Sequence, residues 1–176
     1  MSCRAVLSIG GNRGDALGLL RGVADAAAAD GILRAASSVY ATPPWGGVEQ
    51  DDFLNAALVV EHPGSPADVL EWGFARERAA GRTREVRWGP RTLDVDVVTA
   101  DVDGETVVSD DPILTLPHSR AAESAFVLVP WLEIDPDARL AGVPVTDRLA
   151  ALDPAEVSAV RRLDVSLAPR GWESPA

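Results

Sequence analysis

The sequence contains no lysine, because every one of its 16 basic residues is an arginine. This absence excludes the phosphate-binding lysine of P-loop proteins, the strand lysine of protein kinases and any Schiff-base lysine. Cys3 is the only cysteine, which predicts neither a disulfide framework nor a cysteine-based metal cluster. No apolar run reaches the ~18 residues of a membrane span, and the N-terminus lacks the apolar stretch of a signal peptide. We therefore expect a cytoplasmic protein without membrane-spanning segments.

The length of 176 residues suits one domain. We expect a single domain over 1–176, with its core at about 4–165 and a loose tail at 168–176. The formal net charge of −11 opposes contact with nucleic-acid phosphates and anionic lipid. The charge predicts that the protein binds neither nucleic acid nor membranes, and we expect a monomer.

Apolar spacing and turn residues predict the order strand, helix, strand, strand, helix, strand. Asp15 and Ser65 are suitable caps for the two helices, and Gly31 and Gly81 are suitable stops. The expected strands cover 5–9, 33–40, 53–60, 93–99 and a short 106–108. Further along, the segment 126–132 packs against the core and 154–160 is a last helix. This order predicts an α/β (α+β) fold of the ferredoxin-like kind, with helices on a mainly antiparallel sheet.

Two aspartates share one face of the strand at 93–99. Side chains alternate along a strand, so Leu93, Val95 and Val97 face one way while Asp94 and Asp96 face the other. Mg²⁺ is often held by one or two carboxylates together with water and substrate phosphates. For the D-x-D pattern alone, a solvated outer strand face is the better reading.

An arginine cluster precedes this acidic pair. Guanidinium groups pair with phosphate oxygens, and together with a metal ion they can hold a polyphosphate. The plainer alternative, a solvated basic loop that pairs with nearby acids, is weaker because two carboxylates follow directly. The cluster consists of Arg76, Arg78, Arg82, Arg84, Arg87 and Arg91.

Aromatic residues and an amide suggest a site for a flat ring. Trp45 and Phe53 can sandwich a heterocycle, and Asn55 offers both a donor and an acceptor to its edge. From spacing alone, a core Phe53 and a structural Asn55 are slightly favoured. His118 can donate to a phosphate, although a loop histidine without function is the simpler interpretation.

Taken together, these segments resemble the 6-hydroxymethyl-7,8-dihydropterin pyrophosphokinases of folate biosynthesis. The resemblance runs from the first strand to about Asp135, and its most specific string is RWGPRTLDVD. The other carriers are the GGN turn, VYATPPWG, DFLNAAL, LTLPH and AFVLVPW. It implies a three-layer α-β-α sandwich and an enzyme that moves pyrophosphate from ATP to the hydroxymethyl group of the pterin and releases AMP.

The resemblance also implies roles for individual residues. Two Mg²⁺ ions would lie between ATP and the pair Asp94 and Asp96, and the catalytic residues would be Arg82, Arg91 and Asp96. The pterin would contact Thr42, Pro43, Trp45, Phe53, Asn55, Trp88 and Phe126. ATP would contact Glu77, Arg82, Arg84, Trp88, Arg91, Val97, Thr115, His118 and Arg120.

Two positions depart from the family pattern. Ser124 and Ile113 stand where arginines that help to hold the triphosphate are expected, and Arg120 is a candidate substitute. These departures favour one alternative, a non-catalytic ferredoxin-like ligand-binding module. A second alternative is a different Mg²⁺-dependent nucleotide transferase that uses the D-x-D pair.

Overall fold

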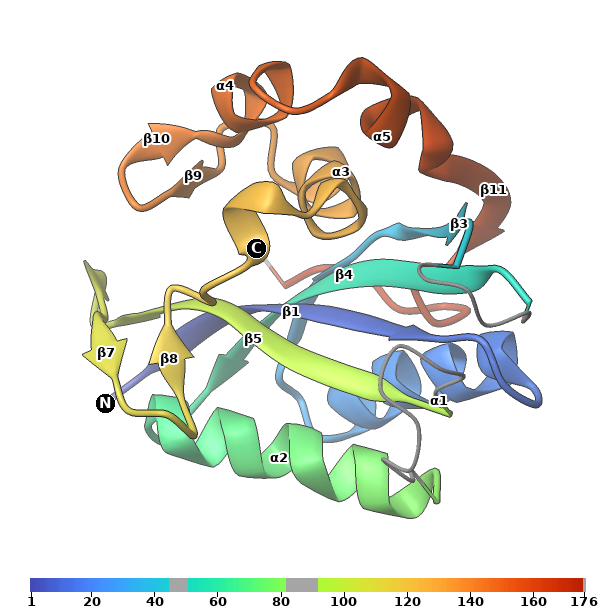
Figure 1. Ribbon diagram of the computed structural model, residues 1–176. Coiled ribbons are helices and arrows are strands. Elements are labelled where there is room, and N and C mark those ends of the chain that lie inside the picture. The colour runs from blue at the N-terminus through green and yellow to red at the C-terminus, as the bar shows by residue number, and fades with distance from the viewer. Residues whose placement is uncertain (45–50, 82–91, 176) are drawn as a thin grey trace.

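The computed structural model describes residues 1–44, 51–81 and 92–175 (Figure 1). Its centre is a seven-stranded sheet in which every paired strand is antiparallel to its neighbour. The strand order is β11 (Arg161–Ser166), β3 (Ser38–Thr42), β4 (Phe53–His62), β1 (Cys3–Gly11), β5 (Asp94–Val102) and β6 (Glu105–Thr106), and β2 (Leu33–Ala36) also pairs with β4. Two short hairpins lie outside it: β7 (Ser109–Asp110) with β8 (Thr115–Leu116), and β9 (Arg139–Leu140) with β10 (Val143–Pro144).

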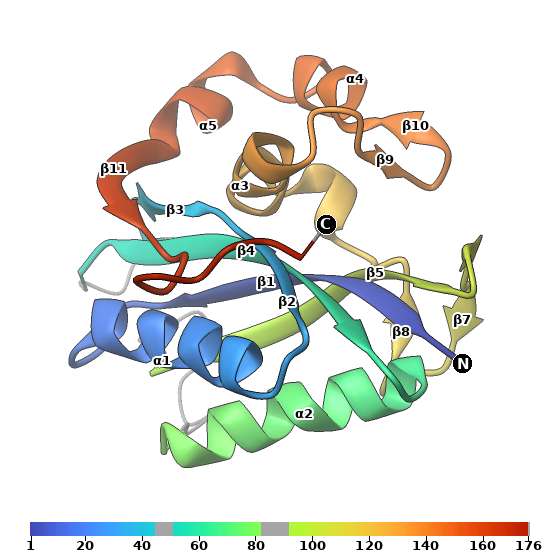
Figure 2. The same cartoon turned by 180° about the vertical axis from the view of Figure 1, so that it is seen from behind.

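Helices cover both faces of the sheet, as Figures 1 and 2 show from opposite sides. One face carries α1 (Ala16–Ala29) and α2 (Pro66–Ala79). The other carries α3 (Ala125–Ile134), α4 (Val145–Ala150) and α5 (Pro154–Ala159), preceded by the 3-10 turn η1 (Ala121–Glu123). This is the predicted three-layer, ferredoxin-like arrangement, and the prediction of the fold class is confirmed.

Each layer boundary has its own apolar core. Leu7, Leu20 and Val69 belong to the cluster between the sheet and α1 and α2. Val59 and Trp131 belong to the cluster between the sheet and α3. Because both faces are covered, the central strands are apolar on both sides over most of their length, and polar residues on them mark exceptions.

The residues predicted to start and end the first two helices do so in the structure. The Asp15 carboxylate accepts from the Gly18 N–H at 3.0 Å at the start of α1. Ser65 caps α2 in a reciprocal capping box with Asp68, whose carboxylate accepts from the Ser65 N–H at 2.8 Å. Gly81 has φ +69°, which ends the second helix in a conformation that favours glycine.

The single strand expected at 33–40 is wrong in detail, because the chain breaks at Ser37 into β2 and β3. The Ser37 hydroxyl accepts from the Ala57 N–H at 2.9 Å and donates to the Ser38 carbonyl at 2.7 Å. A side chain that bonds to neighbouring backbone in this way offers an alternative to the regular ladder. The two strands consequently pair with β4 in different registers.

The C-terminal segment forms more regular structure than the sequence indicated. The helix expected at 154–160 is present as α5, and the chain then forms the edge strand β11 against β3. Leu167 follows this strand with 2% of its surface exposed, and its N–H donates to the Ser37 carbonyl at 3.0 Å. In the segment expected to be loose, the Ser174 hydroxyl donates to the Arg34 carbonyl at 2.7 Å. No helix in the described part of the chain is both long and apolar enough to cross a membrane.

Leu167→Ala tests the contribution of this C-terminal segment to folding. The change removes a fully buried side chain from the main core, so we expect the free energy of unfolding to fall by about 2–5 kcal/mol. Chemical denaturation measures this loss. Val108→Ala is the control, because its side chain is 77% exposed and should change the stability by less than about 0.5 kcal/mol. Equal stability of the two variants would contradict the packing of this segment.

Candidate functional site

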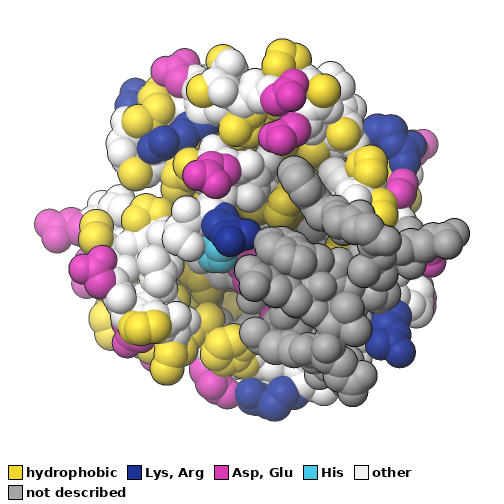
Figure 3. Space-filling model, viewed as in Figure 1, with side chains coloured by type: hydrophobic (Ala, Val, Ile, Leu, Met, Phe, Trp, Pro, Cys, Tyr) yellow, Lys and Arg dark blue, Asp and Glu magenta, His cyan; other side chains and the backbone are white. Residues whose placement is uncertain are grey.

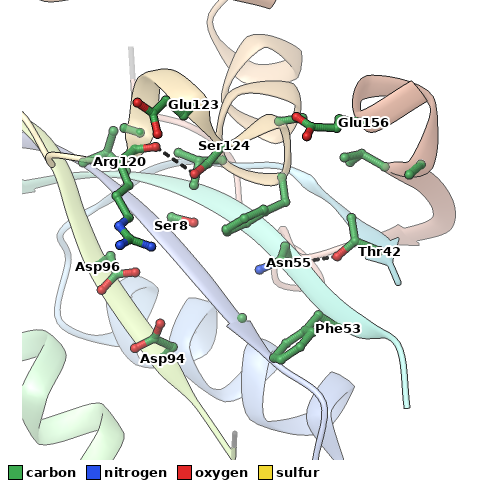
Figure 4. Close-up of a pocket in the computed structure, with 18 of the residues that line it drawn as sticks. Ser8, Thr42, Phe53, Asn55, Asp94, Asp96, Arg120, Glu123, Ser124 and Glu156 are labelled. Carbon is green, nitrogen blue, oxygen red and sulfur yellow. Dashed lines mark hydrogen bonds between the residues drawn. The ribbon is translucent and has the colours of Figure 1, made fainter. Parts of the chain in front are cut away.

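A cavity of about 700 Å³ lies over one end of the sheet, on the face that α3 covers (Figure 4). Its walls come from the sheet, from the chain after β3, from the segment before α3 and from α5. The residues that line it are Ser8, Gly10, Thr42, Pro43, Pro44, Phe53, Asn55, Asp94, Asp96, Val98, His118, Arg120, Ala121, Glu123, Ser124, Ala125, Phe126, Val127, Glu156, Ala159 and Val160.

The register of three strands arranges the floor of the cavity in rows. In one row, Gly10 of β1 lies opposite Asn55 of β4 and Asp94 of β5. The next row has Ser8 in the middle and Asp96 on the β5 side. The cavity therefore has an amide at one side and two carboxylates at the other, with small residues between them.

The two aspartates face the cavity as strand alternation predicts. Both carboxylates are half-buried and point into the space beneath α3 (Figure 4). Leu93, Val95 and Val97 are buried in the core on the opposite face. In the described ranges, no group of three or more His, Cys, Asp or Glu side chains is placed to hold a metal ion by itself. Two carboxylates beside an open cavity fit an ion such as Mg²⁺, which takes its remaining ligands from water and phosphate.

Asn55 is fixed by its neighbours. Its side-chain oxygen accepts from the Thr42 hydroxyl at 3.3 Å, and both residues are buried (Figure 4). This bond directs the amide nitrogen toward Gly10, where a Cβ atom would collide with it. Glycine at this position leaves the space that the amide occupies, so a larger residue would displace Asn55.

Two phenylalanines line the cavity from different layers. Phe53 comes from the start of β4 and Phe126 from the first turn of α3, and both are half-buried. Pro43 and Pro44 continue the wall after β3. Aromatic rings beside a polar edge suit a flat heterocycle with hydrogen-bonding groups along its rim.

His118 is held with one ring nitrogen turned to the backbone. Its Nδ1 accepts from the Arg120 backbone N–H at 3.3 Å, and the backbone N–H of His118 donates to the Val98 carbonyl at 2.8 Å. Burial lowers the pKa of His118, the Asp94 carboxylate raises it and Arg120 lowers it. The lowered pKa favours the neutral ring, and because Nδ1 accepts a hydrogen bond, a neutral ring would donate from Nε2.

Arg120 supplies the positive charge among the described residues at this end of the cavity. Its side chain points toward Asp96 in Figure 4. The Ser124 hydroxyl donates to the Arg120 carbonyl at 2.7 Å, so the serine fixes the main chain at the start of α3. Ile113 is 73% exposed and does not line the cavity. Figure 3 shows that acidic side chains are scattered over this face of the molecule.

Three residues predicted to contact ATP lie outside the cavity lining. Glu77 is buried on α2, where its Oε2 accepts from the Val95 N–H at 2.9 Å and so braces the strand that carries the aspartates. Val97 is in the core below the sheet. Thr115 is exposed on β8, and its hydroxyl donates to the Asp111 carbonyl at 3.0 Å.

Five further predicted residues lie outside the described residues, and their roles stay predictions. They are Trp45, Arg82, Arg84, Trp88 and Arg91. Conversely, the cavity includes residues that sequence reasoning missed, among them Ser8, Glu123, the α5 residues Glu156 and Ala159, and Val160 directly after that helix. Strand alternation was a signal for Ser8, which shares a face with Gly10. The C-terminal segment carries no motif, so nothing in its sequence pointed to the cavity.

Comparisons with known proteins agree with this geometry. The family model described as 7,8-dihydro-6-hydroxymethylpterin-pyrophosphokinase matches residues 6–136. A 2-amino-4-hydroxy-6-hydroxymethyldihydropteridine pyrophosphokinase of Mycobacterium tuberculosis is 48% identical over 168 residues, which cover 90% of this chain and 88% of that one. A protein of the same name from Methylorubrum extorquens is 44% identical over 159 residues, covering 89% and 98% of the two chains.

A structural comparison supports the fold. A crystal structure of the Plasmodium falciparum HPPK-DHPS protein superposes with a TM-score of 0.59 at 12% identity. The match covers 85% of this chain and 44% of the longer Plasmodium chain. Together with the sequence matches, these findings show that the chain belongs to the 7,8-dihydro-6-hydroxymethylpterin-pyrophosphokinase family.

Proposed function

We propose that this chain transfers the β,γ-pyrophosphoryl unit of ATP to the hydroxymethyl group of 6-hydroxymethyl-7,8-dihydropterin and releases AMP. The observation that carries the proposal is that one cavity joins a slot for a flat ring to a pair of carboxylates. The family and the relatives described above support the same reaction.

The pterin would occupy the part of the cavity between Phe53 and Phe126. Asn55 would read the edge of the ring, because its amide nitrogen is directed into the cavity by the bond with Thr42. Pro43 would close the slot beside it. Trp45 and Trp88 remain predicted contacts.

The triphosphate would lie toward β5. Asp94 and Asp96 would hold Mg²⁺, two ions by the family resemblance, and the bound metal would neutralise the charge that develops on the phosphates. Arg120 and the Nε2–H of His118 are the described cation and donor beside these carboxylates. Arg120 would bind part of the triphosphate in place of the arginines that Ser124 and Ile113 replace. Arg82, Arg84 and Arg91 stay predicted phosphate contacts.

In the reaction, the hydroxymethyl oxygen of the pterin forms a bond to the β-phosphorus, and the hydroxyl proton is released to water. The bond from the β-phosphorus to the oxygen that bridges it to the α-phosphorus breaks, and AMP leaves with that oxygen. The chain's contribution is to align the two substrates and stabilise charge, which accounts for most of the catalysis in phosphoryl transfer. His118 carries its ring proton toward the cavity, so it acts as a donor and not as a base.

One assay tests the proposal against its alternatives. Purified protein is incubated with ATP, Mg²⁺ and 6-hydroxymethyl-7,8-dihydropterin, and AMP is measured. AMP that forms only when the pterin is present supports the proposal. ATP binding without turnover would indicate a non-catalytic binding module, and AMP formed with another acceptor would indicate a different transferase.

Asp96→Ala should remove one of the two metal-binding carboxylates. Because a bound metal ion supplies several kcal/mol of charge stabilisation, we expect kcat to fall by more than about 100-fold. The affinity for the pterin, measured by equilibrium binding, should change little, since the ring lies at the other side of the cavity. Asp101→Ala, on the same strand but outside the cavity lining, is the control and should keep normal turnover. Near-normal turnover in Asp96→Ala would overturn the metal assignment.

Gly10→Ala should displace the Asn55 side chain, because the added Cβ would collide with its amide nitrogen. A displaced Asn55 would leave polar groups on the pterin edge unbonded, which costs about 1–3 kcal/mol, so the KM for the pterin should rise about 10- to 100-fold. Steady-state kinetics with varied pterin measures the effect. Gly22→Ala is the control, since its Cβ would meet no atom within 4 Å. An unchanged KM in Gly10→Ala would show that Asn55 does not read the pterin.

Arg120→Ala should weaken ATP binding. Hydrogen bonds to charged groups contribute about 1.5–3 kcal/mol, which corresponds to a rise in the KM for ATP of about 10- to 100-fold. Arg139→Ala is a matched control, because the Arg139 guanidinium donates to the Gly142 carbonyl at 3.0 Å and lies outside the cavity lining. Identical KM values for ATP in the two variants would exclude Arg120 from the phosphate site.

A further inference from the structure

Glu133 is a charged residue in an otherwise apolar helix, and its carboxylate joins that helix to the sheet. The residue belongs to α3, whose sequence is AFVLVPWLEI. Its Oε1 accepts from the Tyr40 hydroxyl at 2.7 Å, and its Oε2 accepts from the Ser38 N–H at 3.0 Å. Both partners belong to β3. One carboxylate therefore holds the last turns of α3 against this strand.

The Ser38 N–H has a specific need for this acceptor. The ladder between β3 and β4 begins at Tyr40, after the break in the strand at Ser37, so Ser38 lies outside the pairing with β4, while on its other side it lies opposite Ser166 of β11. Ser38 is 5% exposed, and leaving a buried N–H unbonded costs about 1–3 kcal/mol. Glu133 accepts from this N–H. Loss of the contact would leave the donor unbonded and would destabilise the folded protein.

Arg162 of β11 completes the cluster but contributes less. Its Nε donates to the Ser38 hydroxyl at 3.1 Å and lies 3.9 Å from Glu133 Oε1. The Arg162 side chain is 63% exposed, and exposed ion pairs are typically worth only about 0–1 kcal/mol. The bonds from the Ser38 N–H and the Tyr40 hydroxyl to a carboxylate are therefore the stronger link between α3 and β3.

The two elements that Glu133 joins also form walls of the cavity. Phe126 lies seven residues before Glu133 on α3, which is about two turns, so both side chains project from one side of the helix. At the far end of β3, Thr42 and Pro43 line the cavity. The placement of α3 relative to β3 thus sets the distance between Phe126 and the opposite wall.

We propose that Glu133 is a positioning residue for the pterin slot, because it holds α3 at the distance from β3 at which Phe126 can stack on the ring. This inference rests on the proposed function. Glu133 does not line the cavity and touches neither substrate, so its effect runs through the placement of Phe126 and Thr42.

Glu133→Ala breaks the link and leaves the cavity lining intact. Loss of stacking between an aromatic side chain and a flat heterocycle weakens binding by about 10- to 100-fold, so we expect the KM for the pterin to rise by this factor. The KM for ATP and kcat at saturating pterin should stay within about threefold of wild type, since Asp94, Asp96 and Arg120 belong to other elements. Glu133→Gln keeps one carbonyl acceptor for the strand, so it should restore most of the pterin affinity.

The matched control is Glu61→Gln. Glu61 also bridges distant segments, because it accepts from the Ser2 hydroxyl at 2.8 Å and from Arg34 Nε at 3.3 Å, but it lies outside the cavity lining. It should leave the KM for the pterin unchanged. A general loosening of the fold would instead raise both KM values in both glutamate variants, and that result would overturn the proposal.

The single tyrosine of the chain reports whether the contact itself has been broken. Burial and the hydrogen bond to Glu133 raise the pKa of Tyr40. In Glu133→Ala its ionisation, followed by near-ultraviolet absorbance, should shift down toward the ordinary pKa of about 10. Tyr40→Phe removes the same bond without touching the helix and should raise the KM for the pterin less than Glu133→Ala does, because the Ser38 N–H keeps its acceptor.

The outcomes separate this inference from the proposed function. Wild-type protein without pterin-dependent AMP release would remove the proposed function, and the inference with it. An active wild type together with an unchanged KM for the pterin in Glu133→Ala would overturn the inference alone. A raised KM without any change in the ionisation of Tyr40 would do the same, because the effect would not run through this contact. If Glu133→Ala fails to fold, Tyr40→Phe carries the same test with a smaller expected rise in the KM for the pterin.

Discussion

The antiparallel pairing of β1 with β4 and with β5 is the constraint on which the site depends. It places residues of three strands in two rows across one face of the sheet: Asn55, Gly10 and Asp94 in the first, and Ala57, Ser8 and Asp96 in the second. Because side chains alternate, the same strands bury apolar residues against α1 and α2 on the other face. One register therefore provides both the core and the cavity floor, and a shift by one residue would exchange them.

The cavity exists because the middle of this floor is made of small residues. Gly10 and Ser8 leave open the space that larger side chains occupy elsewhere between the sheet and α3, where Val59 and Trp131 fill the interior. The amide and the carboxylates then stand on opposite sides of the gap. This division suits a reaction that brings a neutral heterocycle and a metal-bound polyphosphate into contact. The heterocycle would lie beside the amide, and the polyphosphate would lie beside the carboxylates.

Much of this was predictable from local physics, and the rest depended on long-range contacts. Alternation correctly placed Asp94 and Asp96 on one face, and the caps Asp15 and Ser65 correctly started two helices. Chemistry alone left the site open between a metal pair and a solvated strand, and the resemblance of RWGPRTLDVD to one family favours the metal pair. The break at Ser37 was not predictable from its residue type, because it depends on a bond with a distant strand. The strand β11 and the part of the cavity wall that the C-terminal segment forms carry no sequence motif. Only the packing of the folded chain reveals them.

The central claim is that one cavity holds the pterin and ATP side by side, with the pterin ring at the phenylalanines and the β-phosphorus toward the aspartates. A crystal structure with Mg²⁺, a non-hydrolysable ATP analogue and 6-hydroxymethyl-7,8-dihydropterin tests it most directly. We expect the ring between Phe53 and Phe126, its edge bonded to Asn55, and metal between the phosphates and the pair Asp94 and Asp96. A pterin bound elsewhere, or phosphates held away from both aspartates, would contradict the account.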